Sequence, residues 1–199
     1  MLVLFAIEEV YLVRHGKTEW NQTGRRQGQL DSPLSQRGRM EVERTARRIE
    51  SLPVDGVFSS PLGRAIATAQ TFAHALDQTI TVVDDLRELD HGDMAGLTNE
   101  EIERAFPGEL ARRSRDKYRW RFPNGESYAD ADFRAASALH QIAGAGAFRP
   151  LVVSHEMIGR MLLRNLLALD PQDALESGLS HNVIYRIDVE SKTVVEITA

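Results

Sequence analysis

Short apolar runs alternate along the chain with longer segments in which apolar residues recur every three or four positions. The short runs are rich in β-branched residues and predict strands, whereas the longer spacing is typical of helices that bury one face. The predicted strands are 10–13, 54–58, 80–83, 151–153, 183–187 and, after a turn at 190–192, 193–197. The predicted helices are 35–51, 61–76, 99–106, 127–145 and 158–169, with Pro61 in the first turn of its helix.

This alternation of strands and helices predicts an α/β fold in which a mostly parallel sheet is covered on both faces, a three-layer α/β/α sandwich. The chain has 199 residues and shows neither an internal repeat nor a linker, so a single domain over 1–199 is expected. The least regular stretch is 86–128, which contains a charged segment and a Pro-Asn-Gly turn. It is interpreted as a cap-like excursion over a site, with a solvated surface excursion as the alternative.

Composition narrows the class of protein. The 24 basic and 29 acidic residues give a net charge of -5, which does not favour nucleic acid as a partner. The absence of cysteine excludes disulfides, cysteine-ligated metals and cysteine-dependent phosphatase chemistry. The apolar opening 1–7 has no basic flank and is too short to span a membrane, so it is expected to be an extra strand or lead-in. A cytoplasmic protein without a membrane partner is expected by default, and a homodimer stays open.

Candidate chemistry gathers where two predicted strands stop. The first strand ends in Arg14, His15 and Gly16, and the strand at 151–153 is followed closely by His155. Because open α/β folds bind ligands at the carboxyl ends of their strands, both imidazoles are expected at one edge of the sheet. Gly16 is expected to let the backbone turn and to leave room for a ligand. No catalytic role is expected for the remaining histidines, which are His74, His91, His140 and His181, although His91 and His181 could lie near the pocket.

The pattern Arg-His-Gly-x-Thr-x-x-Asn at 14–21 resembles the signature of the histidine phosphatase superfamily, which includes the cofactor-dependent phosphoglycerate mutases. Four further blocks, at 24–35, 59–69, 86–96 and 152–155, resemble that family and occur in the family's order. The resemblance spans nearly the whole chain. It implies a phosphoglycerate mutase-like fold and a single histidine phosphatase domain over 1–199.

The resemblance assigns His15 as a nucleophile that forms a phosphohistidine. The chemistry is reasonable, because histidine titrates near ~6.5 and a neutral imidazole nitrogen can attack phosphorus at pH 7. No metal motif is visible and no cofactor is implied, so Arg14 and Arg64 are expected to stabilise the phosphoryl oxygens as bidentate guanidinium forks. Arg64 stands near a helix start, where free backbone N–H groups assist anion binding. Its alternative is a solvated surface arginine.

The other matched positions receive supporting roles from the same resemblance. His155 resembles the family's second histidine, a hydrogen-bond donor to the transferring phosphoryl group. Glu88 matches the proton donor, which protonates the leaving group and then accepts a proton from water; a surface ion pair is the competing account. Further donors to phosphate oxygens are expected at Asn21, Gln27 and Gly28, for which ordinary turn chemistry is the alternative.

One position departs from the family pattern. The residue after the second histidine is usually glycine, whereas this chain has Glu156. A carboxylate beside a phosphate pocket is unfavourable unless it points away or pairs with a cation such as Arg160.

The stretch 119–128 resembles the short phosphatase branch, because true mutases carry a longer insertion there. The sequence therefore predicts a phosphomonoesterase that hydrolyses a small phosphorylated metabolite, with a 2,3-bisphosphoglycerate-dependent phosphoglycerate mutase second. An arginine pair at 112–113 resembles a carboxylate-binding pair of the mutases, although a charged helix surface is favoured there. From another class, a non-catalytic phosphate- or phosphoprotein-binding module is considered, since fold alone does not establish activity. A metal phosphatase lacks the clustered ligands it needs.

Overall fold

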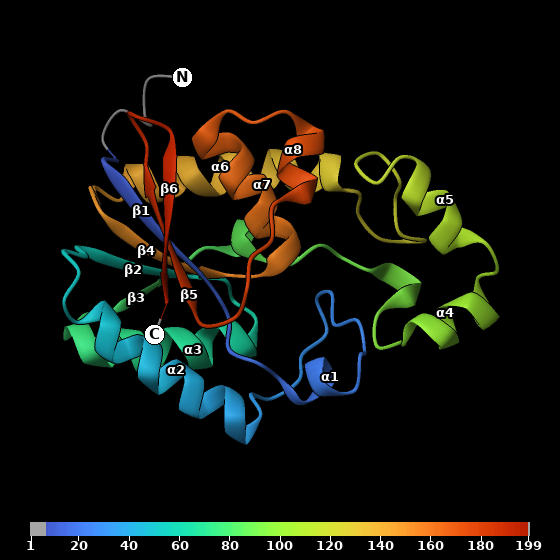
Figure 1. Ribbon diagram of the computed structural model, residues 1–199, viewed down its shortest axis with the longest axis horizontal. Helices are drawn as coiled ribbons and strands as arrows, with labels where there is room; N and C mark the ends of the chain where they lie inside the picture. The colour runs from blue at the N-terminus through green and yellow to red at the C-terminus, as the bar shows by residue number, and fades with distance from the viewer. Residues whose placement is uncertain (1–6, 199) are drawn as a thin grey trace.

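The computed structural model describes residues 7–198, which form six strands and eight α-helices (Figure 1). The strands are β1 (Glu9–Arg14), β2 (Gly56–Ser59), β3 (Ile80–Val82), β4 (Pro150–Ser154), β5 (Val183–Asp188) and β6 (Thr193–Thr198). The helices are α1 (Glu19–Gln22), α2 (Gln36–Ile49), α3 (Gly63–Leu76), α4 (Asn99–Ala105), α5 (Glu109–Arg115), α6 (Tyr128–Gly144), α7 (Glu156–Leu167) and α8 (Pro171–Glu176). Most of the apolar opening lies outside the described residues, but Ile7 is 3% exposed and belongs to the core.

The strands form one sheet in the order β3-β2-β4-β1-β5-β6. The pairs β3–β2, β2–β4 and β4–β1 are parallel, and β5 and β6 form the predicted antiparallel hairpin at one side. Helices α2 and α3 cover one face, and α6 and α7 cover the other (Figure 1). The predicted three-layer α/β/α sandwich with a mostly parallel sheet is confirmed.

Two apolar cores flank this sheet. One includes Leu12 and Val152 with the buried faces of α6 and α7, and the other includes Val13 and Val153 with those of α2 and α3. Successive strand residues point to opposite faces, so a strand buried on both sides reads as an unbroken apolar run. This is why the strand at 151–153 could be recognised from hydrophobicity alone.

The segment between β3 and α6 leaves the layers. Its helices α4 and α5 lie beyond the carboxyl ends of β1 and β4, to the right in Figure 1. Phe122 and Tyr128 bring the segment back into the core, where they are 2% and 1% exposed. Only α4 was expected here, because the seven residues of α5 are mostly charged and show no apolar stripe.

Two helix starts differ from the prediction. Helix α3 begins at Gly63 with Leu62 as its N-cap, so Pro61 precedes the helix instead of occupying its first turn. Helix α7 begins at Glu156, two residues before the predicted start. Among residues 7–198, no helix combines the length and hydrophobicity that a membrane crossing requires.

Candidate active site

His15 and His155 lie side by side at the carboxyl edge of the sheet. The parallel register of β1 and β4 places Arg14 opposite Ser154, so the next residue of each strand is a histidine. The backbone N–H of His15 donates to the Ser154 carbonyl at 2.9 Å. The ring centroids of the two histidines are 5.1 Å apart, and their side chains are buried, with exposures of 3% and 0% for the residues.

The contacts of His15 fix which ring nitrogen carries the proton. Its Nδ1 lies 2.8 Å from the Gly16 carbonyl, which only accepts, so Nδ1 is the protonated nitrogen. Arg64 Nε donates to Nε2 at 3.2 Å, which requires a lone pair on Nε2. Burial first, and then the positive charges of Arg64 and Arg14, hold the pKa of His15 well below its usual value. His15 is therefore neutral at pH 7, with a nucleophilic nitrogen at Nε2.

His155 contacts a serine hydroxyl instead of a carbonyl and a guanidinium. Its Nε2 lies 2.7 Å from Ser60 Oγ, which itself accepts from the backbone N–H of Leu62 at 3.3 Å. The Ser60 hydroxyl has one proton and one further lone pair, so it can donate to Nε2 or accept from it; when it donates, the imidazole proton is on Nδ1. That nitrogen is buried and has no hydrogen-bond partner within the described chain. Burial, followed by the charge of Arg64, holds the pKa of His155 well below its usual value, so this ring is neutral.

Arg64 is the most tightly held cation of the site. Its guanidinium donates to His15 Nε2, to the carbonyls of Gly28 at 2.7 Å and Leu30 at 2.8 Å, and to Asp31 Oδ1 at 3.1 Å. These contacts use four of its five N–H donors, so only one N–H of Nη2 is left for a ligand. The expected bidentate contact of Arg64 with a phosphoryl group is therefore not available in this structure. The backbone N–H of Arg64, expected to be free at the helix start, donates to Asp31 at 3.2 Å.

Arg14, the residue before His15, forms an ion pair with Glu156. Its Nη1 donates to the Leu179 carbonyl at 3.1 Å and lies 2.9 Å from Glu156 Oε2. The second oxygen of Glu156 lies 2.8 Å from Arg160 Nη2, the cation suggested by the sequence. Arg14 Nε is buried without a hydrogen-bond partner among residues 7–198. The carboxylate of Glu156 thus forms two ion pairs, and one of its partners, Arg14, is an arginine that was expected to bind phosphate.

Glu88 is placed by the start of α7. Its Oε1 accepts from the backbone N–H groups of Leu89 at 3.0 Å and Ile158 at 2.9 Å, and its Oε2 accepts from that of Met157 at 3.1 Å. The residue is 7% exposed. Because each carboxyl oxygen has two lone pairs, the one that the backbone leaves unused is on Oε2. A surface ion pair does not describe this residue, whose carboxyl group caps a helix.

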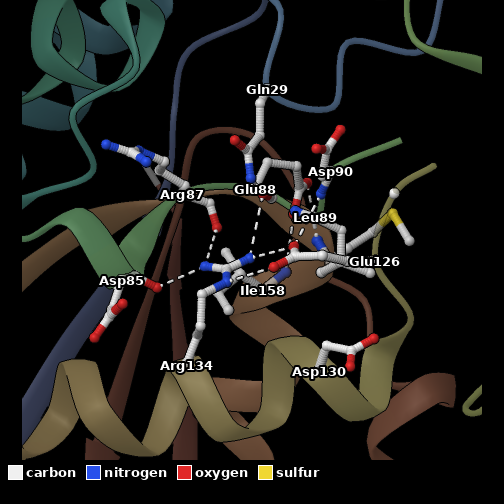
Figure 2. Close-up of polar contacts among 12 residues, drawn as sticks. Gln29, Asp85, Arg87, Glu88, Leu89, Asp90, Glu126, Asp130, Arg134 and Ile158 are labelled. Carbon is white, nitrogen blue, oxygen red and sulfur yellow. Dashed lines mark hydrogen bonds and ion pairs between the residues drawn. The ribbon is translucent and has the colours of Figure 1, made fainter. Parts of the chain in front are cut away.

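The backbone that carries Glu88 is held by an arginine of α6 (Figure 2). Arg134 donates to the carbonyls of Asp85 at 2.8 Å, Arg87 at 3.0 Å and Glu88 at 3.4 Å, and to both carboxyl oxygens of Glu126. Glu126 also accepts from the backbone N–H of Asp90 at 3.0 Å. Arg134 and Glu126 therefore form a clamp around 85–90, which the sequence gave no signal to find.

The remaining expected donors are less exposed to a ligand than predicted. Asn21 Oδ1 accepts from the N–H and the hydroxyl of Thr18, each at 3.0 Å, which is the helix-capping alternative. Gln27 is buried, with Oε1 unpaired among the described residues. Gly28 has φ +53, and a Cβ there would lie 2.9 Å from the His91 ring, which explains the glycine.

Gly16 has a different role from the one expected. A Cβ at Gly16 would lie 2.5 Å from Val42 Cγ2, so the glycine admits α2 close to the strand end instead of making room for a ligand.

His181, which the sequence left as a residue that could lie near the pocket, contacts the site. His181 Nδ1 donates to the His15 carbonyl at 2.8 Å, and the two rings are 5.5 Å apart. Burial, with the charge of Arg14, lowers the pKa of His181 to about 4. His181 lines a cavity of about 420 Å³ together with Arg14, Lys17 and Glu156. It precedes its strand instead of following one, so the argument from strand ends assigned it no role. No group of three acidic or histidine side chains within 7–198 is placed to hold a metal ion.

Known proteins resemble this chain in sequence, and solved structures resemble it in fold. The profile of the histidine phosphatase superfamily (branch 1) matches residues 10–197. A probable phosphoglycerate mutase GpmB of Salmonella choleraesuis is 36% identical over 188 residues, which cover 92% of this chain and 85% of that protein. A mycobacterial glucosyl-3-phosphoglycerate phosphatase is 25% identical, with a TM-score of 0.82 over 96% of this chain and 97% of that chain. A putative α-ribazole-5'-P phosphatase of Escherichia coli, 20% identical, has a TM-score of 0.87 over 96% and 95% of the two chains.

Proposed function

Because the chain belongs to the histidine phosphatase superfamily, we propose that it is a phosphomonoesterase that hydrolyses a small phosphorylated metabolite through a phosphohistidine on His15. The observation that carries the proposal is the Nε2 atom of His15, a neutral, buried nitrogen whose lone pair faces the guanidinium of Arg64. The phosphatase names of the structural neighbours support it. Residues 1–199 then form one such domain, with 86–128 as a cap over the substrate.

In the first half-reaction, Nε2 of His15 attacks phosphorus. A P–N bond forms while the bond from phosphorus to the ester oxygen breaks, and Oε2 of Glu88, the oxygen with an unused lone pair, supplies a proton to the leaving alkoxide. The phosphoryl oxygens are bound by the free N–H groups of Arg14, by the remaining N–H of Arg64 and by Nδ1–H of His155. These fixed charges and dipoles supply the electrostatic stabilisation that a phosphoryl transfer needs.

In the second half-reaction, water attacks the phosphohistidine. Glu88 takes a proton from the water as the new P–O bond forms and the P–N bond breaks, which restores neutral His15 and releases inorganic phosphate. His15 returns to its starting tautomer because the Gly16 carbonyl continues to accept from Nδ1. Asn21 and the loop at 27–28 supply weaker, outer contacts.

Trapping the intermediate tests the proposal directly. Brief mixing with ³²P-labelled phosphomonoester, quenched without acid, should leave an acid-labile and base-stable label on His15, as a P–N bond requires. His15→Ala should lose the label and the turnover while keeping its far-UV circular dichroism, since this side chain belongs to neither apolar core. Near-normal turnover of His15→Ala would refute the assignment. Label on His155 would reverse the roles of the two histidines.

A phosphoglycerate mutase is the second candidate, favoured by the name of the 36%-identical relatives. Incubation with 3-phosphoglycerate and 2,3-bisphosphoglycerate distinguishes the two, because a mutase yields 2-phosphoglycerate whereas a phosphatase yields glycerate and inorganic phosphate. A non-catalytic binding module would bind phosphate but give neither product.

A further inference from the structure

Glu156 places a negative charge at the phosphate site, and its two partners determine what that charge does. The Glu156 carboxylate bridges Arg14 at 2.9 Å and Arg160 at 2.8 Å. Its side chain is 35% exposed and lines the same cavity as Arg14, whereas the two arginine side chains are only 16% and 13% exposed. The carboxylate is thus neither turned away from the site nor buried beneath it.

Arg14 does not need Glu156 to hold its position. Its Nη1 also donates to the Leu179 carbonyl at 3.1 Å, and its guanidinium is largely buried. Nε, which has no partner among residues 7–198, and Nη2 are the donors available to an anion. Glu156 and a phosphoryl group therefore bind different N–H groups of one guanidinium. They compete for its charge, because a cation that is already paired attracts a second anion less strongly.

Arg160 is fixed independently and draws on the other oxygen of Glu156. Its Nε donates to the Ser177 carbonyl at 2.7 Å and its Nη1 to the Tyr128 hydroxyl at 2.7 Å. Two arginines and one carboxylate leave this side of the site with one net positive charge instead of two. Arg160 thereby limits how much of the Glu156 charge acts on Arg14.

We propose that Glu156 is an affinity-setting residue that shares Arg14 with the phosphoryl group and weakens the binding of inorganic phosphate, so that the product is released. The inference rests on the proposed function, since it takes Arg14 as a phosphate ligand. Its direction is definite: the charge of Glu156 opposes phosphate binding, whereas a residue that merely braced Arg14 would favour it.

Calorimetric titration with inorganic phosphate at pH 7.5 and fixed ionic strength tests this direction. Glu156→Gln keeps the shape and removes the charge, and it should bind phosphate about tenfold more tightly, the size expected for one charge acting across a partly solvated site. Phosphate should inhibit its turnover at correspondingly lower concentration, and KM should fall without a rise in kcat. Arg160→Met should bind phosphate more weakly than the parent, and this loss should shrink in the double variant with Glu156→Gln.

Asp132→Asn is the matched control. Asp132 pairs with Arg164 of α7 at 2.9 Å but does not line the cavity. Its substitution removes the same charge and should leave phosphate affinity within about twofold. Unchanged or weaker phosphate binding by Glu156→Gln, in an enzyme whose parent binds phosphate and hydrolyses p-nitrophenyl phosphate, overturns this inference alone. A parent chain that does neither overturns the proposed function as well.

Discussion

Substituting Glu88 with glutamine separates the chemistry of the carboxyl group from its role in capping α7. The amide oxygen can take the place of Oε1 and accept from Leu89 and Ile158, as the carboxyl group does. The amide nitrogen then stands where Oε2 stood and presents N–H groups to the N–H of Met157, 3.1 Å away in the parent protein. One hydrogen bond to a carboxylate is lost, and two donors face each other.

The structure gives the size of the loss of stability. A hydrogen bond to a charged group contributes about 1.5–3 kcal/mol, and a carboxylate at a helix N-terminus adds about 0.3–1 kcal/mol. We therefore expect Glu88→Gln to lower the free energy of unfolding by about 2–4 kcal/mol in urea denaturation. The capping-box residue Glu101, whose Oε2 accepts from Thr98 N–H at 2.9 Å, provides a control helix cap outside the site.

The loss of proton transfer is measured by comparing two substrates with different leaving groups. An alkoxide needs a proton and p-nitrophenolate does not, so general acid catalysis worth about 10²–10⁴-fold should be lost on an alkyl phosphate and largely kept on p-nitrophenyl phosphate. Glu101→Gln should lose stability without changing the ratio of the two activities. Equal losses of kcat/KM on both esters for Glu88→Gln would show that the residue acts only as a cap, and the proton-transfer role would have to be abandoned.

Three further outcomes are expected. Activity on p-nitrophenyl phosphate should survive exhaustive EDTA treatment, since Arg14 and Arg64 supply the positive charge; activity that is lost and then restored by added divalent metal would reject this. Burial lowers the pKa of His91 to about 3 and that of His181 to about 4, so the unfolded chain binds protons that the folded protein excludes. The free energy of unfolding should accordingly fall as pH drops from about 6.5 towards 4, by up to about 1.4 kcal/mol per pH unit for each such histidine, and less steeply in His91→Phe. Arg134→Met, which releases the backbone of 85–88, should lower both the stability and the ratio of activity on alkyl phosphate to activity on aryl phosphate. The control Arg164→Met should lower stability alone. An unchanged ratio in Arg134→Met would show that the clamp does not affect proton transfer by Glu88.

The apolar runs of the sequence could predict only those site residues that follow the ends of buried strands. The runs at 10–13 and 151–153 are buried on both faces and therefore stand out, and the parallel pairing expected of an α/β chain brings His15 and His155 together. The same reasoning did not apply to His181, which lies in the loop before β5, where spacing carries no information about distance in space. Its contact with the His15 carbonyl depends on the antiparallel return of β5 beside β1.

Other features depended on contacts between segments far apart in the sequence. The donors of Arg64 were expected to be free for phosphate, but the loop at 28–31 uses three of them and His15 a fourth. Helices α1 and α8 have four and six residues, too few to show a helical repeat. The sequence suggested Arg160 as a partner for Glu156, because it lies one helical turn further along α7. The second partner, Arg14, lies at the end of β1 and could not be predicted from spacing.

The pairing of β1 with β4 has a consequence for how such a chain can diverge. Neighbouring strands in any sheet lie about 4.7–4.9 Å apart, and the two histidines, one residue past paired positions, inherit that spacing with ring centroids at 5.1 Å. No loop length enters this distance. Insertions, deletions or complete replacement of the stretch that holds α4 and α5 can therefore change which substrates enter the site. The distance between the two imidazoles stays constant, because backbone hydrogen bonds between β1 and β4 fix it.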